Sequence, residues 1–354
     1  MAYHIVLSVP FDVEAMQRGA ERDENPRHIL YEVSRRLSAT VHMPGSSPSL
    51  IDRALSKLIG LPGHWSTARQ MAATLRDTDT VFCAGDDGGL PLVLACLARR
   101  RRPKIAIGVM VPERRRQSVL FRLLRRRIDL FVVNAEHKRR ALQRIVGCPP
   151  DHIFLWIEQT DTEFFSPGEK RRRERPLIFA AGREQRDYRT LARATEHLDV
   201  DVVVCAISPN AGDKTAGAFP DPIPANMSFH PYPWPEFRQA YRDADVVVVS
   251  LLDHTYSAGA TSMVEAMACR RPVVVTRIPG LAEQFVDGGY VTGVAPGATD
   301  DMRRAIEGLL ADKESAEAQA TRAHDLINQK HSAIVVREPL IEKLLSMGTT
   351  STQG

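Results

Sequence analysis

The chain has 354 residues, of which 44% are apolar and 25% are charged, and its formal net charge is +4. This composition excludes an intrinsically disordered chain. No apolar run reaches the roughly 18 residues that a bilayer-spanning helix needs, and the length favours two domains.

Short apolar, β-branched runs alternate with helix-length amphipathic stretches in the first half of the chain. One such helical stretch begins at Ile29. This alternation is typical of a doubly wound α/β domain with a parallel sheet. The predicted strands are Ile5–Val9, Val81–Ala84, Ile105–Val111, Leu130–Asn134 and Phe154–Ile157.

A charged stretch bracketed by prolines, residues 166–176, predicts a linker. The net charge changes sign there: residues 1–175 hold 30 Lys and Arg against 20 Asp and Glu, and residues 176–354 hold 17 against 23. We therefore expect an N-terminal domain over residues 1–165 and a C-terminal domain over residues 177–335. Residues 336–354 are predicted to form a helix, which could pack back on the N-terminal domain, and a frayed tail.

The second half repeats the alternation of strands and helices. Its apolar runs are continuous, as expected for parallel strands that are covered on both faces. A second doubly wound domain is therefore predicted. The predicted strands are Leu177–Ala181, Val202–Ile207, Val246–Leu251 and Val273–Thr276, and the predicted helices near the end of the chain are Asp301–Leu310, Glu314–Asn328 and Glu338–Leu345.

The segment Leu251–Cys269 is the most informative one for function. A buried strand ends, a loop of small residues follows, and a helix is predicted to begin near Thr261. Ligands of open α/β sheets bind at the carboxyl ends of strands, and amide groups at a helix N-terminus suit a phosphate. Ala258, Gly259 and Ala260 leave room for such a ligand, and Glu265 could accept hydrogen bonds from ribose hydroxyls. The pattern predicts a nucleotide site.

This arrangement resembles glycosyltransferase family 4, the retaining enzymes with the GT-B fold. The resemblance rests on four segments in the family's order. It implies two Rossmann-like domains that face a central cleft, with the nucleotide sugar on the C-terminal domain and the acceptor on the N-terminal domain. The four segments are TDTEFFSP (Thr160–Pro167), AAGREQRDYRTLARA (Ala180–Ala194), YRDADVVVVSL (Tyr241–Leu251) and VEAMACRRPVVVTRIPGLAEQFVDGG (Val264–Gly289).

The resemblance also implies roles for individual residues. Glu265 matches the carboxylate that holds the nucleotide ribose, and Arg183 matches the arginine that neutralises the donor diphosphate. Arg186 is the nearest cation where the family usually has a lysine. Ser257 stands where the family commonly has a second glutamate. The predicted catalytic residues are Arg183 and Arg186, and the predicted donor-binding residues are Arg183, Arg186, Ser257, Ala258, Gly259, Ala260, Thr261 and Glu265.

The activity that the resemblance implies is transfer of a sugar, with retained configuration, from a nucleotide-diphosphate sugar to a hydroxyl acceptor. A lipid-linked or cell-envelope glycan is the acceptor that we expect, and neither a cofactor nor a metal is expected. Two alternatives remain open. One is another GT-B enzyme, such as a nucleotide-sugar epimerase or a phosphorylase, and the other is a sugar-nucleotide-binding protein without catalysis.

Three Asp-x-Asp pairs could suggest a metal site. Each pair directly precedes an apolar strand, which places it at the amino edge of a sheet, opposite the ligand side. We therefore interpret these aspartates as turn residues. The pairs are Asp77 with Asp79, Asp199 with Asp201, and Asp243 with Asp245.

The basic excess is densest from Arg99 to Arg144, with 16 basic and three acidic residues. Within it, Arg114–Ile128 combines arginines with an apolar stripe (Val119, Leu120, Leu123 and Leu124). The stripe could lie on an anionic membrane or pack on the N-terminal sheet. Nucleic-acid binding is not expected, since only 6% of residues are aromatic.

The start of the chain and the cysteines indicate the cellular compartment of the protein. The N-terminus passes directly into a predicted strand without a cationic stretch, and the five cysteines are far apart and mostly in apolar runs. A cytoplasmic protein with reduced thiols is expected, peripheral on the inner face of the plasma membrane if the basic region binds lipid.

Overall fold

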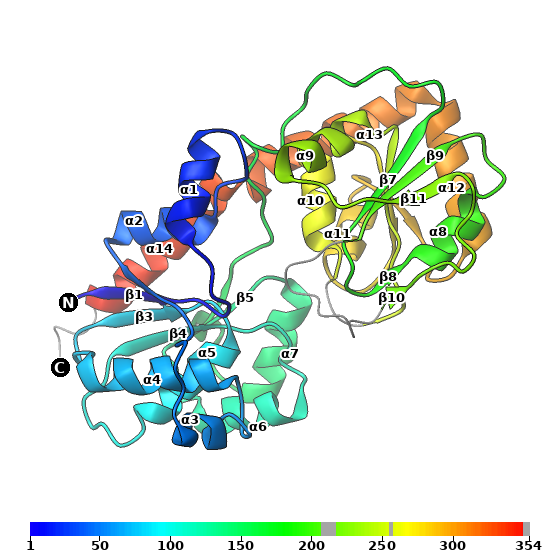
Figure 1. Ribbon diagram of the computed structural model, residues 1–354. Coiled ribbons are helices and arrows are strands. Elements are labelled where there is room, and N and C mark those ends of the chain that lie inside the picture. The colour runs from blue at the N-terminus through cyan, green and yellow to red at the C-terminus, as the bar shows by residue number, and fades with distance from the viewer. Residues whose placement is uncertain (207–216, 255–257, 350–354) are drawn as a thin grey trace. The chain divides into compact units, whose positions relative to one another are not determined.

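The computed structural model describes residues 1–206, 217–254 and 258–349. Its contacts divide the chain into two compact units (Figure 1). Unit 1 comprises Met1–Gln17, His28–Ile157 and the C-terminal segment that begins at Val336, and unit 2 comprises Arg18–Arg27 and Glu158–Val335.

The change of unit after Ile157 comes earlier than the predicted domain end at residue 165. Phe164 and Phe165 explain the difference, because both side chains are buried in the core of unit 2. The predicted linker is also held to unit 2, where Arg171 donates through its backbone N–H and its Nε to the Asp243 carboxylate.

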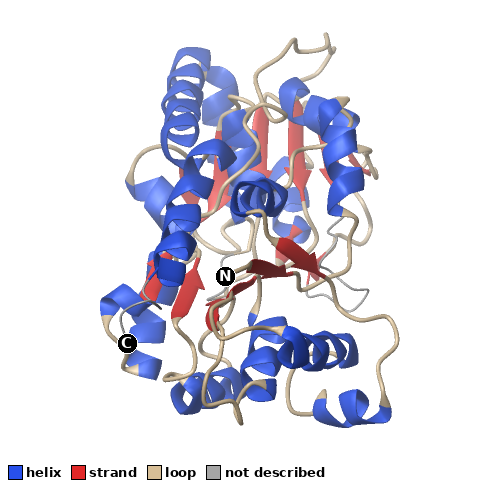
Figure 2. Ribbon diagram, turned by 90° about the vertical axis from the view of Figure 1, so that its left-hand side faces the viewer, coloured by secondary structure: helices blue, strands red, loops and turns tan. Residues whose placement is uncertain are grey.

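Unit 1 is built on a six-stranded parallel sheet with the strand order β2-β1-β3-β4-β5-β6. Helices flank the strands in both units, as Figure 2 shows. The edge strand β2 was not predicted, because it is short and lacks a buried face. In chain order the unit contains β1 (Tyr3–Val6), α1 (Val13–Glu21, whose end belongs to unit 2), α2 (Ile29–Leu37), β2 (Thr40–His42), α3 (Leu50–Leu55), α4 (Pro62–Thr74), β3 (Thr80–Cys83), α5 (Asp86–Ala95), β4 (Lys104–Gly108), α6 (Arg115–Leu124), β5 (Leu130–Val133), α7 (Glu136–Val146), a 3-10 turn (Pro150–His152) and β6 (Ile153–Leu155).

Unit 2 has a second six-stranded parallel sheet, with the order β11-β9-β7-β12-β13-β14. This is the strand order of a Rossmann fold. The prediction of two doubly wound parallel-sheet domains is therefore confirmed, while the outer strands β11 and β14 and a small two-stranded sheet (β8 and β10) were not predicted. In chain order the unit contains β7 (Leu177–Ala181), β8 (Arg186–Asp187), α8 (Tyr188–Thr195), β9 (Asp201–Cys205), β10 (Gly217–Ala218), β11 (Met227–Phe229), α9 (Trp234–Asp243), β12 (Val246–Val249), α10 (Ala260–Ala268), β13 (Val273–Thr276), α11 (Leu281–Asp287), β14 (Thr292–Val294), α12 (Thr299–Ala311), α13 (Lys313–Leu326) and a π-helical turn (Ile327–His331).

Both faces of the unit 2 sheet are buried, as the continuous apolar runs predict. Val246 and Val248 of β12 pack on the side of α8 and α12. Val247 and Val249 pack on the opposite side, with α9 and α10. Alternate residues of one strand therefore pack in two separate cores. Because both faces of the sheet are covered, a ligand site is expected at the ends of the strands.

The last helix, α14 (Ala333–Thr349), carries the chain from unit 2 to unit 1. There Trp156 donates from its indole Nε1 to the Val336 carbonyl at 3.0 Å, and Arg337 pairs with Glu32 of α2 at 2.9 Å. The five cysteines are free thiols. Within the described residues, no helix combines the length and the apolar character that crossing a bilayer demands.

Candidate functional site

The strand order of unit 2 reverses between β7 and β12. These two strands are neighbours, Val246 pairing with Ile178, although they are far apart in the sequence. In open α/β sheets a ligand binds outside the carboxyl ends of the strands at such a switch point. The loops that follow β7 and β12 are therefore the candidate site.

The loop after β7 begins with Gly182 and Arg183. Gly182 has φ +97°, and a Cβ atom there would lie 2.3 Å from Nη2 of Arg186, so only glycine fits. Arg183 is half-buried, and within the described part of the chain its buried Nε has no hydrogen-bond partner. A buried N–H group without a partner costs free energy, and a phosphate oxygen could satisfy it.

Arg186 has a different environment, because it is only 5% exposed. Its Nε donates to the Ala181 carbonyl at 2.8 Å, its Nη1 to the Glu184 carbonyl at 2.9 Å and its Nη2 to Ser262 Oγ at 3.0 Å. These contacts use three of the five N–H groups of the guanidinium, so the role of Arg186 as a cation for the diphosphate stays a prediction. The same contacts join the loop after β7 to the first turn of α10, a role that sequence spacing does not reveal.

The predicted turn before Glu265 caps helix α10. Gly259 has φ +81°, and a Cβ atom there would approach Val249 Cγ1 to 2.7 Å. Ala258 and Ala260 are buried, and the helix begins at Ala260. The first four N–H groups of a helix have no partner within it, so this turn can present amides to an anion. Ser257 lies outside the described residues.

Glu265 lies one turn into α10 and is only 7% exposed. Tyr241 of α9 donates its hydroxyl to Glu265 Oε2 at 2.8 Å. Burial raises the pKa of the Glu265 carboxyl to about 8 and nearby Glu158 acts in the same direction, while the Tyr241 hydrogen bond and the charge of Arg186 lower it. The carboxyl is therefore held in one orientation and close to its protonation point near neutral pH.

Three partners of this site were missed by the sequence reasoning. Tyr241 orients Glu265, Ser262 accepts from Arg186, and Glu158 accepts from Thr261 Oγ1 at 3.0 Å. Tyr241 stands at the beginning of a segment that carries the family resemblance, which was the available signal. Ser262 and Glu158 carry no comparable signal in the sequence.

Unit 1 has its own switch point between β1 and β3. Ser8 follows β1 and donates its hydroxyl to Asp87 Oδ1 at 2.7 Å, at the N-terminus of α5. The Leu61 N–H donates to His64 Nδ1 at 3.0 Å, so His64 donates from Nε2 to the Ser8 carbonyl at 2.8 Å. These contacts give a polar edge at the carboxyl ends of the strands, where a hydroxyl-bearing ligand could bind.

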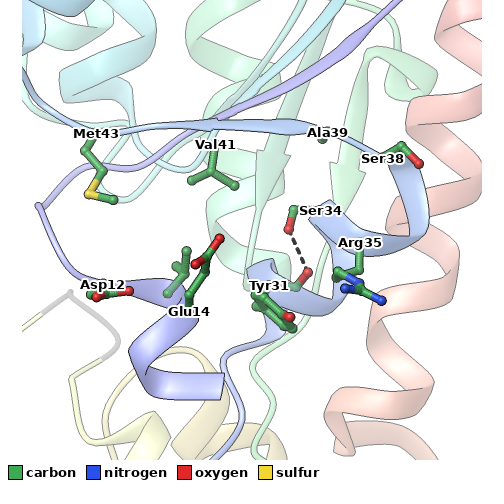
Figure 3. A pocket seen from close by; sticks show the side chains of 10 residues that line it. Asp12, Glu14, Tyr31, Ser34, Arg35, Ser38, Ala39, Val41 and Met43 are labelled. Atoms are coloured by element: carbon green, nitrogen blue, oxygen red, sulfur yellow. Dashed lines mark hydrogen bonds between the residues drawn. The ribbon is translucent and has the colours of Figure 1, made fainter. Parts of the chain in front are cut away.

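A pocket of about 820 Å³ lies at the outer edge of the same sheet, beside β2. Figure 3 shows Glu14 of α1 and Tyr31 and Arg35 of α2 on its walls, with Val41 of β2 and Met43 above them. The volume is within the range of about 300–1,000 Å³ that is usual for ligand pockets. Six of its ten lining residues are polar or charged, which suits a hydroxylated ligand better than an apolar one.

Four of the Asp-x-Asp aspartates, Asp79, Asp201, Asp243 and Asp245, accept hydrogen bonds from the chain itself. Asp79 accepts from the Ala2 and Arg76 N–H groups, and Asp245 accepts from the Leu177 N–H at 2.8 Å. The three pairs lie at the starts of β3, β9 and β12, which are the amino edges of the sheets, as predicted. Among the described residues, no three His, Cys, Asp or Glu side chains gather as metal ligands.

Solved structures show which class of fold this is. The chain is similar over its whole length to a glycosyltransferase from Rickettsia africae (TM-score 0.73, 13% identity, 100% of each chain). It is also similar to α,α-trehalose 6-phosphate synthase from Burkholderia multivorans (TM-score 0.73, 13% identity, 99% and 100%) and to Anabaena Alr3699/HepE in complex with UDP and glucose (TM-score 0.68, 13% identity, 98% and 100%). The fold is GT-B.

Part of the sequence also matches the model of a known protein family. Residues 177–312 match the family model described as glycosyl transferases group 1. The matched residues lie within unit 2, in the half of the chain that carries most of the predicted resemblance.

Curated relatives match more distantly. The D-inositol 3-phosphate glycosyltransferase of Corynebacterium glutamicum is 26% identical over 252 residues, which covers 64% of this chain and 56% of that protein. The protein of the same name from Mycobacteroides abscessus is 27% identical over 265 residues, covering 69% and 58%. The chain thus spans about half the length of the curated relatives that it matches.

Proposed function

We propose that this protein is a glycosyltransferase that binds a nucleotide-diphosphate sugar at the carboxyl ends of β7 and β12. The observation that carries this proposal is that three features lie at the switch point of unit 2: Arg183, whose buried Nε has no hydrogen-bond partner among the described residues, the N-terminus of α10, and the oriented Glu265 carboxyl. A guanidinium and helix amides suit a diphosphate, and a carboxylate suits two ribose hydroxyls.

The proposed reaction is transfer with retained anomeric configuration and without a bound metal. The bond between the anomeric carbon and the diphosphate oxygen breaks, the acceptor oxygen forms the new bond on the vacated face, and the acceptor proton passes to the departing oxygen. Negative charge grows on the diphosphate, so Arg183 and the α10 amides stabilise the transition state more than the ground state.

The proposed acceptor is a hydroxylated compound, a glycan or a lipid-linked glycan, bound by unit 1. The polar edge at Ser8 and Asp87 and the pocket beside β2 support this assignment. Because a lipid-linked acceptor stays at the bilayer, it requires a surface of unit 1 that meets a membrane.

The test begins with UDP-, GDP-, ADP- and dTDP-sugars in a thermal-shift screen, since a bound ligand raises Tm by mass action. The stabilising donor is then incubated with candidate acceptors, with and without EDTA, and the product anomer is assigned by NMR. We expect the α-anomer of an α-linked donor, unaffected by EDTA. Inverted products or loss of turnover in EDTA would contradict the mechanism.

Arg183→Ala should lower kcat by about 10²- to 10³-fold while changing the nucleotide Kd far less, because Arg183 acts on charge that develops at the transition state. Arg193→Ala, an exposed arginine of α8, is the matched control and should behave as wild type. A weaker nucleotide Kd with an unchanged kcat would assign Arg183 to ground-state binding alone.

A further inference from the structure

The basic region of unit 1 contains two kinds of arginine. Some hold the fold: Arg102 pairs with Asp129 at 2.5 Å, and Arg127 donates to the Arg99 carbonyl at 3.1 Å. Lys138, which the charge pattern assigned to the same basic field, is buried and donates to Asn134 at 2.7 Å. The charge run is therefore in part structural, and only its exposed members can meet a partner.

Helix α6 carries the exposed members on its outward face. Its inner face is formed by Phe121, which packs edge-to-face on Phe131, and by Leu124. Val119 and Leu123 are 56% and 73% exposed. The predicted four-residue stripe is thus split, with Leu124 in the core and Val119 and Leu123 in solvent.

Exposed arginines surround these two apolar side chains. Arg115, Val119, Arg122 and Arg126 follow each other at helical spacing, so they share one face. Within the described residues, the side chains of Arg115, Arg116 and Arg126 make no hydrogen bond or ion pair with the protein and are exposed. A face with two apolar residues inside a ring of unpaired cations is the pattern of a helix that lies in a membrane interface.

Hydrogen bonds make this face continuous with two neighbouring segments. Arg127 also donates to the Leu97 carbonyl, which fixes the loop that contains the exposed Arg100 and Arg101 beside the end of α6. Arg122 donates to the Ile145 carbonyl at 3.1 Å, which brings the end of α7, with exposed Arg144, to the same helix. In Figure 1, α6 lies at the outer side of unit 1 with α7 next to it.

We propose that the outward face of α6, with Val119 and Leu123 inside the arginines at 100, 101, 115, 116, 126 and 144, docks unit 1 on an anionic phospholipid surface. The aliphatic side chains enter the acyl boundary while the guanidinium groups contact lipid phosphates. A polyanion such as RNA would use the arginines but would leave Val119 and Leu123 in water. This surface adds a membrane partner to the proposed function, and its evidence is independent of the donor site.

The test is co-sedimentation of the full chain with vesicles of phosphatidylcholine alone and of phosphatidylcholine with phosphatidylglycerol. We expect binding only to the anionic vesicles, weakened by salt. Each unpaired arginine near an anionic surface contributes about fivefold to partitioning, so Arg115→Gln with Arg126→Gln should weaken binding roughly 25-fold. The matched control, Arg172→Gln with Arg193→Gln, removes the same charge from exposed sites of unit 2 and should bind as wild type.

Insertion is tested separately from charge. Val119→Ser with Leu123→Ser should also weaken vesicle binding at unchanged net charge, and Leu123→Trp should show blue-shifted emission on anionic vesicles. An unchanged Tm confirms that these surface variants fold. Equal loss in the matched control, unaffected binding by the Ser variant, or tighter binding to RNA than to vesicles would overturn the proposal. Donor binding in the thermal-shift screen is unaffected by any of these results.

Discussion

At the scale of single residues, the two arginines of the loop after β7 have separate environments. Arg183 keeps a buried N–H without a partner among the described residues, whereas the guanidinium of Arg186 is used by the chain. Both are cations three positions apart, and sequence alone cannot assign their contacts. The structure therefore leaves an unused donor on Arg183 and uses Arg186 to hold the loop after β7 against α10.

The buried Glu265 carboxyl predicts how donor affinity varies with pH. Its pKa is raised to about 8, so the group is mostly protonated at lower pH and must lose its proton to accept two hydrogen bonds from ribose. We expect the nucleotide Kd to fall as pH rises, by up to about tenfold per unit between about pH 6 and pH 8. Calorimetric titration across this range measures the dependence.

Two variants separate this prediction from other titrations. Glu265→Gln should bind the nucleotide weakly, with a Kd that no longer changes with pH. Tyr241→Phe, which removes the hydrogen bond at Oε2, should shift the pH at which the Kd changes to a higher value.

The raised pKa of the Glu265 carboxyl also means that the folded state holds a proton that the unfolded state releases. The free energy of unfolding therefore falls as pH rises from about 4.5 to about 8, and Glu265→Gln should abolish that part of the fall. Identical pH profiles for wild type and Glu265→Gln would refute the assignment.

At the scale of elements, the site depends on two segments held together by Arg186. Ser250 and Leu252 hydrogen-bond the loop after β7, and Arg186 spans from that loop to Ser262 of α10. Gly182 and Gly259 allow the positive φ angles that this close approach needs. The site is thus a property of paired loops rather than of one motif.

Arg186→Ala is predicted to destabilise unit 2. The substitution removes the Arg186 donor from the Ala181 and Glu184 carbonyls and from Ser262 Oγ, of which Ala181 keeps only a long hydrogen bond from Ser262 Oγ at 3.4 Å, and the loss costs about 3 kcal/mol. Urea unfolding measures the loss. Arg183→Ala, a substitution of the same kind in the same loop, should leave stability within about 0.5 kcal/mol of wild type. A stable Arg186→Ala variant would show that these contacts do not hold the loops.

At the scale of the whole molecule, the sequence predicted the two parallel sheets because their central strands are continuous apolar runs. The strands missed were the edge strands β2, β11 and β14, which are only three residues long and partly exposed, and the two-residue strands β8 and β10. The boundary was placed late because composition marks residues 166–176 as charged, whereas the contacts of Phe164 and Phe165 decide the division. Neither packing partners nor hydrogen-bond acceptors can be read from composition.

At the candidate site, too, the sequence predicted the position of the residues but not their packing or hydrogen-bond partners. Small residues before a helix and a carboxylate one turn later predicted where α10 begins, and Ala260 and Glu265 lie as that pattern requires. The burial of Glu265, its hydrogen bond with Tyr241 and the engagement of Arg186 depend on residues from other elements. Those features needed the folded chain.

The central claim, that a nucleoside diphosphate binds at the carboxyl ends of β7 and β12, is tested most directly by calorimetric titration. UDP, GDP, ADP and dTDP are titrated onto wild type and onto Glu265→Ala at about pH 8, with Arg193→Ala as control. The account predicts saturable one-to-one binding of one nucleotide to wild type and control, weakened about 10- to 100-fold in Glu265→Ala. Equal affinity of that nucleotide for wild type and Glu265→Ala, or binding of none of the four, would contradict it.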